Sequence, residues 1–183
     1  MAANTAYVTA GKPAVAGGIY YAPAGTALPT DSTTALAGTY VLLGYIGEDG
    51  VTNSNAPEAS TVRAWGGYDV LTLQTGRADT FQFTLLEALN TDVLKVVYGD
   101  TNVSGALNTG VTVQVGPGAL EEHVYVIDML MTGDVTKRVV IPVGQLQTVG
   151  DVTYADGSAV GYQVTINAAP DSTGKTHYEY MAE

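Results

Sequence analysis

The sequence predicts a mainly β protein, an antiparallel β-sandwich or half-barrel with one short flanking α-helix. Apolar and polar residues alternate with a period of two in several segments, as they do in strands with one buried and one solvent-facing side. Glycine clusters at 47–50, 66–67, 116–118 and 156–157 separate these segments, which is typical of turns between strands. A single segment, residues 90–98, has the apolar spacing of a helix.

The clearest alternation lies in residues 78–85, 111–115 and 160–167. In the first of these, one predicted face carries Phe81, Phe83 and Leu85, and the other carries Thr80, Gln82 and Thr84. Residues 40–46, 123–131 and 137–141 are instead nearly continuous apolar runs, which predicts strands that are buried on both faces.

The helix is expected to begin after Asn90, whose side chain can accept hydrogen bonds from free amides of the first turn. Asp92 would then lie near the positive end of the helix dipole, and Gly99 suits the position after the last turn. A capping-box pattern at Thr84 and Glu87 offers an earlier start, but the alternation makes Thr84 a strand residue.

Two segments are predicted not to pack by themselves. Residues 1–16 are rich in Ala, Thr and Gly, and residues 47–61 form a polar stretch that is unusually long for a loop inside a compact domain. No internal repeat and no linker interrupts the chain, so residues 1–183 are expected to form one domain.

Composition excludes several classes of protein. The chain has 18 acidic and 7 basic residues in 183, a formal charge of −11, and it has no cysteine. A hydrophobic fraction of 46% argues against disorder, and the missing cysteines exclude disulfides and thiolate zinc sites. The acidity argues against phosphate-neutralising nucleic-acid binding. We expect no membrane-spanning segment, and the first residues lack the pattern of a signal peptide.

The catalytic search finds no constellation that supports an enzyme. His123 and His177 are the only histidines, and neither accompanies a nucleophile-elbow serine. Glu121 and Glu122 precede His123, but a strand sends adjacent side chains to opposite faces, so we expect a surface strand start instead of a metal site. Trp65 is the only tryptophan, and it suits either a stacked ligand or a subunit contact.

The order and spacing of several motifs resemble those of the tail tube proteins (major tail proteins) of long-tailed, non-contractile phages, particularly phages of actinobacteria. The motifs are Gly44-Tyr45-Ile46, Glu48-Asp49-Gly50-Val51, Arg63-Ala64-Trp65-Gly66-Gly67, Asp79-Thr80-Phe81-Gln82-Phe83-Thr84-Leu85, Val97-Tyr98-Gly99, Val139-Val140-Ile141-Pro142, Gly161-Tyr162-Gln163-Val164 and His177-Tyr178-Glu179-Tyr180. Together they extend over roughly residues 12–180.

The resemblance implies a structural virion protein without cofactor or enzymatic activity, made in the cytoplasm of the bacterial host. Subunits of this family form rings, usually hexameric, that stack into a tube through which genomic DNA passes. The implied partners are further copies of the chain and other tail proteins, namely the terminator, the tape measure and the tip. Residues 1–16 would be an extended N-terminal arm and residues 47–61 a long assembly loop.

Two sets of candidate site residues follow from this resemblance. The candidate subunit interface comprises Glu48, Asp49, Val51, Arg63 and Trp65. The candidate lumen face comprises the uncharged polar residues Thr72, Gln74, Thr80, Gln82 and Thr84. Because a wall of lysine and arginine would hold DNA by its phosphates, we expect an acidic or neutral wall to let DNA pass without binding.

Two alternatives remain open. Another tube-like component, such as a tail terminator, a connector or the tube of a phage-derived secretion device, would share the fold and differ in assembly. A carbohydrate-binding or adhesin β-sandwich would use Trp65 and tyrosines to stack sugars.

Overall fold

The computed structural model describes residues 3–15 and 17–183. The strands are β1 (Gly11–Pro13), β2 (Ile19–Pro23), β3 (Val41–Leu42), β4 (Thr52–Arg63), β5 (Asp69–Leu85), β6 (Val103–Ala106), β7 (Gly110–Val113), β8 (Glu122–Met131), β9 (Thr136–Val149), β10 (Tyr162–Ala169) and β11 (Tyr178–Ala182). The α-helix is α1 (Thr91–Tyr98), and short 3-10 turns lie at Thr5–Tyr7 and Asp100–Asn102.

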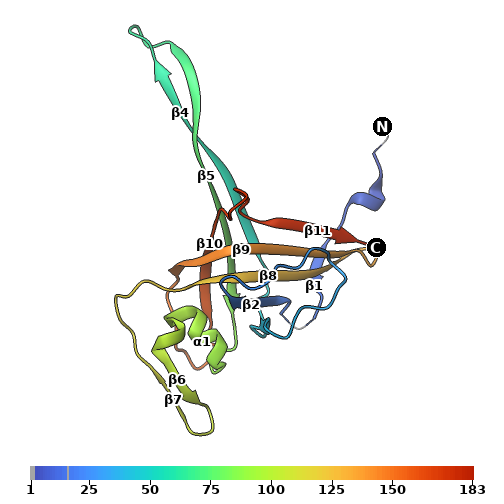
Figure 1. Ribbon diagram of the computed structural model, residues 1–183, viewed down its shortest axis with the longest axis vertical. Coiled ribbons are helices and arrows are strands. Elements are labelled where there is room, and N and C mark those ends of the chain that lie inside the picture. Colours follow the sequence, from blue (N-terminus) through green and yellow to red (C-terminus); the bar gives the residue numbers. More distant parts are fainter. Residues whose placement is uncertain (1–2, 16) are drawn as a thin grey trace.

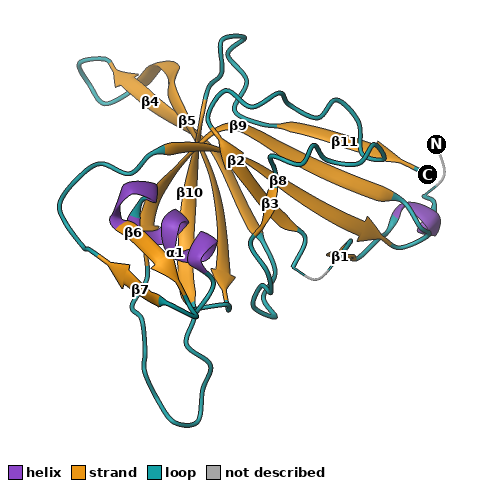
Figure 2. Cartoon of the chain, turned by 60° about the horizontal axis from the view of Figure 1, so that its bottom comes forward, coloured by secondary structure: helices purple, strands orange, loops and turns teal. Residues whose placement is uncertain are grey.

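Nine strands form one antiparallel sheet in the order β3-β2-β8-β9-β10-β5-β4, with β1 paired to β8 and β11 paired to β9. Strands β6 and β7 form a separate pair that lies with α1 against one face of this sheet (Figures 1 and 2). The prediction of a mainly antiparallel β, sandwich-like fold with one flanking helix is confirmed.

The centre of the sheet is buried on both faces. On one face, Tyr125 and Ile127 of β8 pack into the main core together with α1. On the other face, Val124 and Val126 pack beneath residues 24–40 in a smaller cluster. The predicted two-sided burial of 123–131 and 137–141 is therefore confirmed.

Residues 40–46 do not follow this prediction. Only Val41 and Leu42 form a strand, at the end of the sheet, and Tyr45 is 62% exposed. The run does not become a central strand because its pairing with β2 stops after two residues, although Leu43 still packs into the main core and Tyr40 into the smaller cluster.

The alternating segments and the helix form as predicted. Phe81, Phe83 and Leu85 of β5 are buried against α1, and β10 shows the same alternation. The side chain of Asn90 accepts a hydrogen bond of 3.0 Å from the amide of Asp92. Gly99 has φ of 100°, which glycine adopts without strain. The alternative helix start is wrong, because Thr84 belongs to β5.

Both segments predicted not to pack contain strands. Within the predicted arm, residues 11–13 pair with β8, while residues 1, 2 and 16 lie outside the described residues. Most of the predicted loop 47–61 belongs to β4, so its description as a loop is wrong. The sequence conceals β4 because its polar side chains are mostly exposed on both faces, and only pairing with β5 makes it a strand.

We expect Asn90→Ala to lower the free energy of unfolding by about 1 kcal/mol, because the substitution removes the acceptor for a free helix amide. Urea denaturation followed by circular dichroism measures this change. Asn108→Ala, in the exposed turn between β6 and β7, is the control and should have a much smaller effect. Equal effects of the two substitutions would contradict the capping role.

Candidate functional site

The most distinctive feature of the molecule is the hairpin of β4 and β5, which projects far from the body (Figure 1). Strand β10 pairs with β5 only between Leu85 and Thr80. From Asp79 to Asp69 the strand pairs with β4 alone. The outer hairpin is therefore a two-stranded ribbon without a core of its own.

A short turn with two glycines closes the hairpin. The amide of Ala64 donates to the carbonyl of Tyr68 over 2.8 Å, and Gly66 and Gly67 have φ of 110° and 89°. A solvent-exposed ion pair of 2.8 Å joins Arg63 to Asp69 across the ribbon. Trp65, in this turn, is fully exposed.

A bulge in the ribbon exchanges its two faces. Glu58 pairs with Gly76, but the next residue, Ala59, pairs with Gln74, so Thr75 is an extra residue in β5. Paired residues share a face, and alternation along β4 continues through this point. Thr80 and Gln82, nearer the body, therefore lie on the face that carries Leu73 and Leu71 farther out.

This exchange divides the candidate lumen residues. Thr80, Gln82 and Thr84 lie on the face of β5 that points away from the main core. Thr72 and Gln74 lie on the opposite face of the ribbon, because the bulge separates the two sets. They do not form the single row that uninterrupted alternation would give.

Beyond the bulge, the ribbon carries apolar side chains that are exposed to solvent. Val62 pairs with Leu71, and Leu73 shares their face; these three side chains are 46%, 52% and 48% exposed. We call this group the distal apolar face. Trp65 and Tyr68 add two exposed aromatic rings at the tip of the hairpin. Apolar side chains gathered on a projecting ribbon are typical of a contact surface.

The candidate interface residues fall into two groups. Glu48 and Asp49 are exposed in the turn before β4, and Val51 is half-buried against the main core. Arg63 and Trp65 lie at the far end of β4. The twelve-residue strand β4 joins the groups, and the twelve steps from Val51 to Arg63 span roughly 40 Å at about 3.3 Å per residue.

Sequence reasoning missed the distal apolar face. Leu71 and Leu73 alternate with polar residues just as Phe81 and Phe83 do, and such alternation predicts a core-facing side. The period of the sequence identifies a strand but does not reveal whether other strands cover it.

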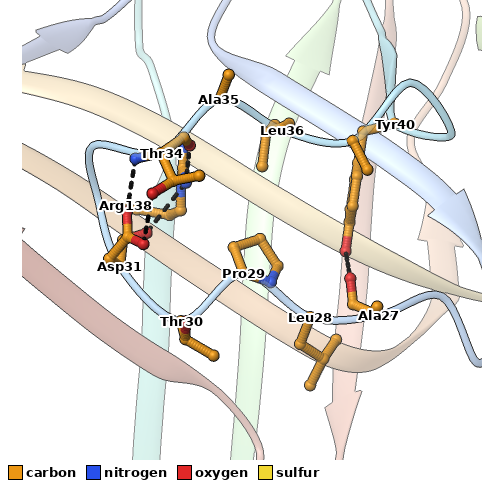
Figure 3. Close-up of a pocket in the computed structure, with 11 residues that line it drawn as sticks. Ala27, Leu28, Pro29, Thr30, Asp31, Thr34, Ala35, Leu36, Tyr40 and Arg138 are labelled. Carbon is orange, nitrogen blue, oxygen red and sulfur yellow. Dashed lines mark hydrogen bonds between the residues drawn. The ribbon is translucent and has the colours of Figure 1, made fainter.

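A cavity of about 250 Å³ lies between residues 27–40 and the sheet (Figure 3). Arg138 forms its floor and donates to both carboxylate oxygens of Asp128, at 2.7 and 2.9 Å. It also donates to the carbonyls of Asp31 and Thr34. Hydrogen bonds from Thr34 and Thr33 lower the pKa of the Asp31 carboxyl to about 2. Arg138 thus holds the loop of residues 27–40 onto the sheet. The charged side chains of Arg138 and Asp31 at this cavity are already hydrogen-bonded within the subunit.

The two histidines each face one carboxylate, at separate places in the fold. His123 is 3% exposed, which makes the predicted surface position wrong: it packs edge-on against Tyr21 and Tyr125 beneath the loop after α1. Its Nε2 lies 3.3 Å from Asp100. In the described part of the chain, no three His, Asp or Glu side chains gather closely enough to hold a metal ion.

Comparison with known families settles the class of protein. Residues 1–183, the whole chain, match the family model described as phage tail tube protein. The chain belongs to this family. No curated protein matches it.

Membership in the tail tube family gives the protein a structural role in the phage tail, where it associates with itself and with other tail proteins of the virion. The family is not known to be enzymatic. Among the described residues, no helix has the length and apolar character that crossing a membrane requires. The projecting hairpin of this tail tube protein is therefore the leading candidate for a subunit contact.

The two leucine environments of β5 predict different effects of one substitution. Leu85 is fully buried, so Leu85→Ala should lower the free energy of unfolding by about 2–5 kcal/mol. Leu73→Ala, on the distal apolar face, should lower it by less than about 1 kcal/mol in the dissociated subunit. Urea denaturation of dilute protein measures both. A large loss from Leu73→Ala would show that the distal face already packs within the subunit.

Proposed function

We propose that the protein assembles into stacked rings, hexameric as is usual in its family, and that the rings form the tube through which phage DNA leaves the capsid. The β4–β5 hairpin is the main contact between subunits in this proposal. Its exposed distal apolar face is the observation that carries the proposal, because such a surface gains free energy once a neighbour covers it. The tail terminator, tape measure and tip proteins would bind the tube at its ends or in its lumen.

The open edge of β4 supports the same role. Strand β5 occupies one side of β4, and no strand of the described chain pairs with the other. An unpaired edge of twelve residues can bond to a strand of another subunit, although Pro57 interrupts the row of amides. Glu48, Asp49 and Val51 at the inner end, and Arg63 and Trp65 at the outer end, are the proposed interface residues along this hairpin.

A head-to-tail contact of this kind has two geometric outcomes. The subunits form a ring when successive rotations between neighbours bring the last subunit back to the first. They form a filament when a second contact repeats along the axis. Negative-stain electron microscopy across protein concentration distinguishes them. Stacked rings support the tube, whereas single closed rings alone would favour a terminator.

We expect the double variant Leu71→Ala, Leu73→Ala to weaken assembly while leaving the dissociated subunit folded. Each leucine is about half exposed, so covering it contributes about 1 kcal/mol. Losing both should raise the dissociation constant roughly thirtyfold, measured by sedimentation velocity.

The control for this experiment is Leu107→Ala. Leu107 is 64% exposed in the turn between β6 and β7, away from the hairpin. Unchanged assembly of the Leu71, Leu73 double variant, or an equal loss from Leu107→Ala, would contradict the hairpin contact.

The distribution of charge supports passage of DNA without adhesion. Of the seven basic side chains, five already contact acceptors in the same subunit. These five are Arg63 on Asp69, Arg77 on Asn55, Lys95 on Asp92, Lys137 on Glu179 and Arg138 on Asp128. Four of these contacts are ion pairs, whereas Arg77 donates to an uncharged amide oxygen and keeps its charge unbalanced. Seven basic residues against 18 acidic ones, four of them already in ion pairs, supply few cations for the phosphate neutralisation that tight DNA binding requires.

We expect assembled tubes to retain no short double-stranded DNA in cosedimentation at low salt. If Thr80, Gln82 and Thr84 line the lumen, Gln82→Lys should create binding that falls steeply with added salt. Gln74→Lys, beyond the bulge and on the opposite face, is the matched control and should not. Appreciable binding by the unmodified tube would contradict the proposal of a non-adhesive wall, and binding by Gln74→Lys alone would move the lumen to Thr72 and Gln74.

A further inference from the structure

A buried carboxylate marks the point where the hairpin leaves the sheet. Thr80 is the last residue of β5 that pairs with β10, and Asp79 is the next residue outward. Asp79 is 1% exposed, whereas the residues beyond it in β5 are almost all exposed. Asp79 therefore lies at the base of the hairpin, where the three-stranded part of the sheet becomes a two-stranded ribbon.

Three side chains from two other segments donate hydrogen bonds to this carboxylate. Asn53 of β4 donates to Oδ1 over 2.8 Å. Thr176 and His177 approach Oδ2, with the Thr176 hydroxyl at 2.5 Å and the His177 Nδ1 at 2.6 Å. Burial alone would raise the pKa of the Asp79 carboxyl, but these three bonds outweigh it and lower the pKa below its usual value. The site therefore favours an ionised carboxylate that accepts from every partner.

The residues that hold Asp79 are themselves held in place. The ring of His177 packs edge-on against Phe81, with centroids 5.3 Å apart, and Phe81 belongs to the main core. On the N-terminal side of Thr176, Asp171 accepts hydrogen bonds from the amides of Thr173 and Lys175 and fixes the turn that follows β10. Directly after His177, Tyr178 begins β11, which pairs with β9. Thr176 and His177 thus sit on a segment that is fixed at both ends.

We propose that Thr176 and His177 form a latch: their hydrogen bonds to Asp79 hold the β4–β5 hairpin at a fixed angle to the body. With the latch closed, the distal apolar face points in one direction before another subunit arrives, so less conformational freedom is lost on contact. With the latch open, the ribbon pivots at its base, since Asp79 is the outermost buried residue of β5. The meaning of the latch for assembly rests on the proposed function of the hairpin, but the latch itself is a property of the single subunit.

Trp65 makes the latch measurable. It is the only tryptophan of the chain, and it lies fully exposed at the tip of the hairpin. Time-resolved fluorescence anisotropy of Trp65 in dilute, dissociated subunits reports motion of the ribbon on the nanosecond timescale. Hydrogen exchange of the β4 and β5 amides near Asp79 reports the slower opening at the base.

We expect Asp79→Asn, His177→Gln and Thr176→Val each to increase the amplitude of the nanosecond anisotropy decay of Trp65. Asp79→Asn should have the largest effect, because it removes the charge and replaces one of the two accepting oxygens by an N–H donor. Each variant should also lower the protection of the amides at the base roughly tenfold, as expected for the loss of a hydrogen bond to a charged group.

Asp100→Asn is the matched control. It removes the carboxylate that faces the other histidine, His123, and it lies near α1, away from the hairpin. The latch is contradicted if the Asp79 and His177 variants lose global stability while Trp65 moves as it does in Asp100→Asn. Thr176→Val removes one hydroxyl at nearly constant volume, so it decides the question if the other variants fail to fold. Since no assembly is needed, failure of ring formation and failure of the latch give separate results.

Discussion

Strand β5 is the element on which the rest of the structure depends, because one continuous backbone serves two environments. Its inner part lies between β4 and β10 and carries Phe81, Phe83 and Leu85 into the main core. Its outer part pairs with β4 alone and carries Leu71 and Leu73 into solvent. The inner part therefore contributes to the stability of the subunit, and the outer part extends a surface that the subunit itself does not cover. The proposed assembly would use both properties, since the subunit would fold by itself and then bind its neighbours through the outer part.

An element of this fold could be predicted when the residues that define it lie close together in the sequence. The helix at 91–98 and the inner strands could be predicted because their signals are local: a cap at Asn90, a positive-φ glycine at Gly99 and alternation over a few residues. Strand β4 could not, because its pairing with β5 defines it and its own side chains are polar. The run 40–46 misleads for the opposite reason, since its side chains are apolar but only two of its residues pair with a neighbouring strand.

The candidate site was predictable in part. The resemblance to tail tube proteins directed attention to Trp65 and to the polar faces of β5, and the structure places Trp65 at the tip of a projecting hairpin. It did not reveal that a single extra residue, Thr75, moves Thr72 and Gln74 to the face opposite Thr80 and Gln82. The bulge exchanges the faces of the β5 residues Leu71 to Gln74, yet the apolar residues of the sequence keep the same odd-numbered spacing on both sides of it. The role of Asp79 was hidden for a related reason, because its partners Thr176 and His177 lie almost a hundred positions away.

The charge of the subunit acquires a more specific meaning from these contacts. A net charge of −11 describes an average, whereas DNA moving through a tube would meet individual side chains. Most of the basic groups are held by acceptors of the same subunit, and Arg138 and Lys137 lie on β9, in the body of the subunit. Thr80, Gln82 and Thr84 carry no charge at all. A wall built from such residues would neither concentrate phosphates nor rely on strong repulsion, because uncharged polar groups exchange hydrogen bonds with water at little net cost. In this proposal, DNA adheres weakly because most of the few cations are paired with carboxylates of the same subunit. The net negative charge of the chain accompanies this pairing but is not itself the cause of the low adhesion.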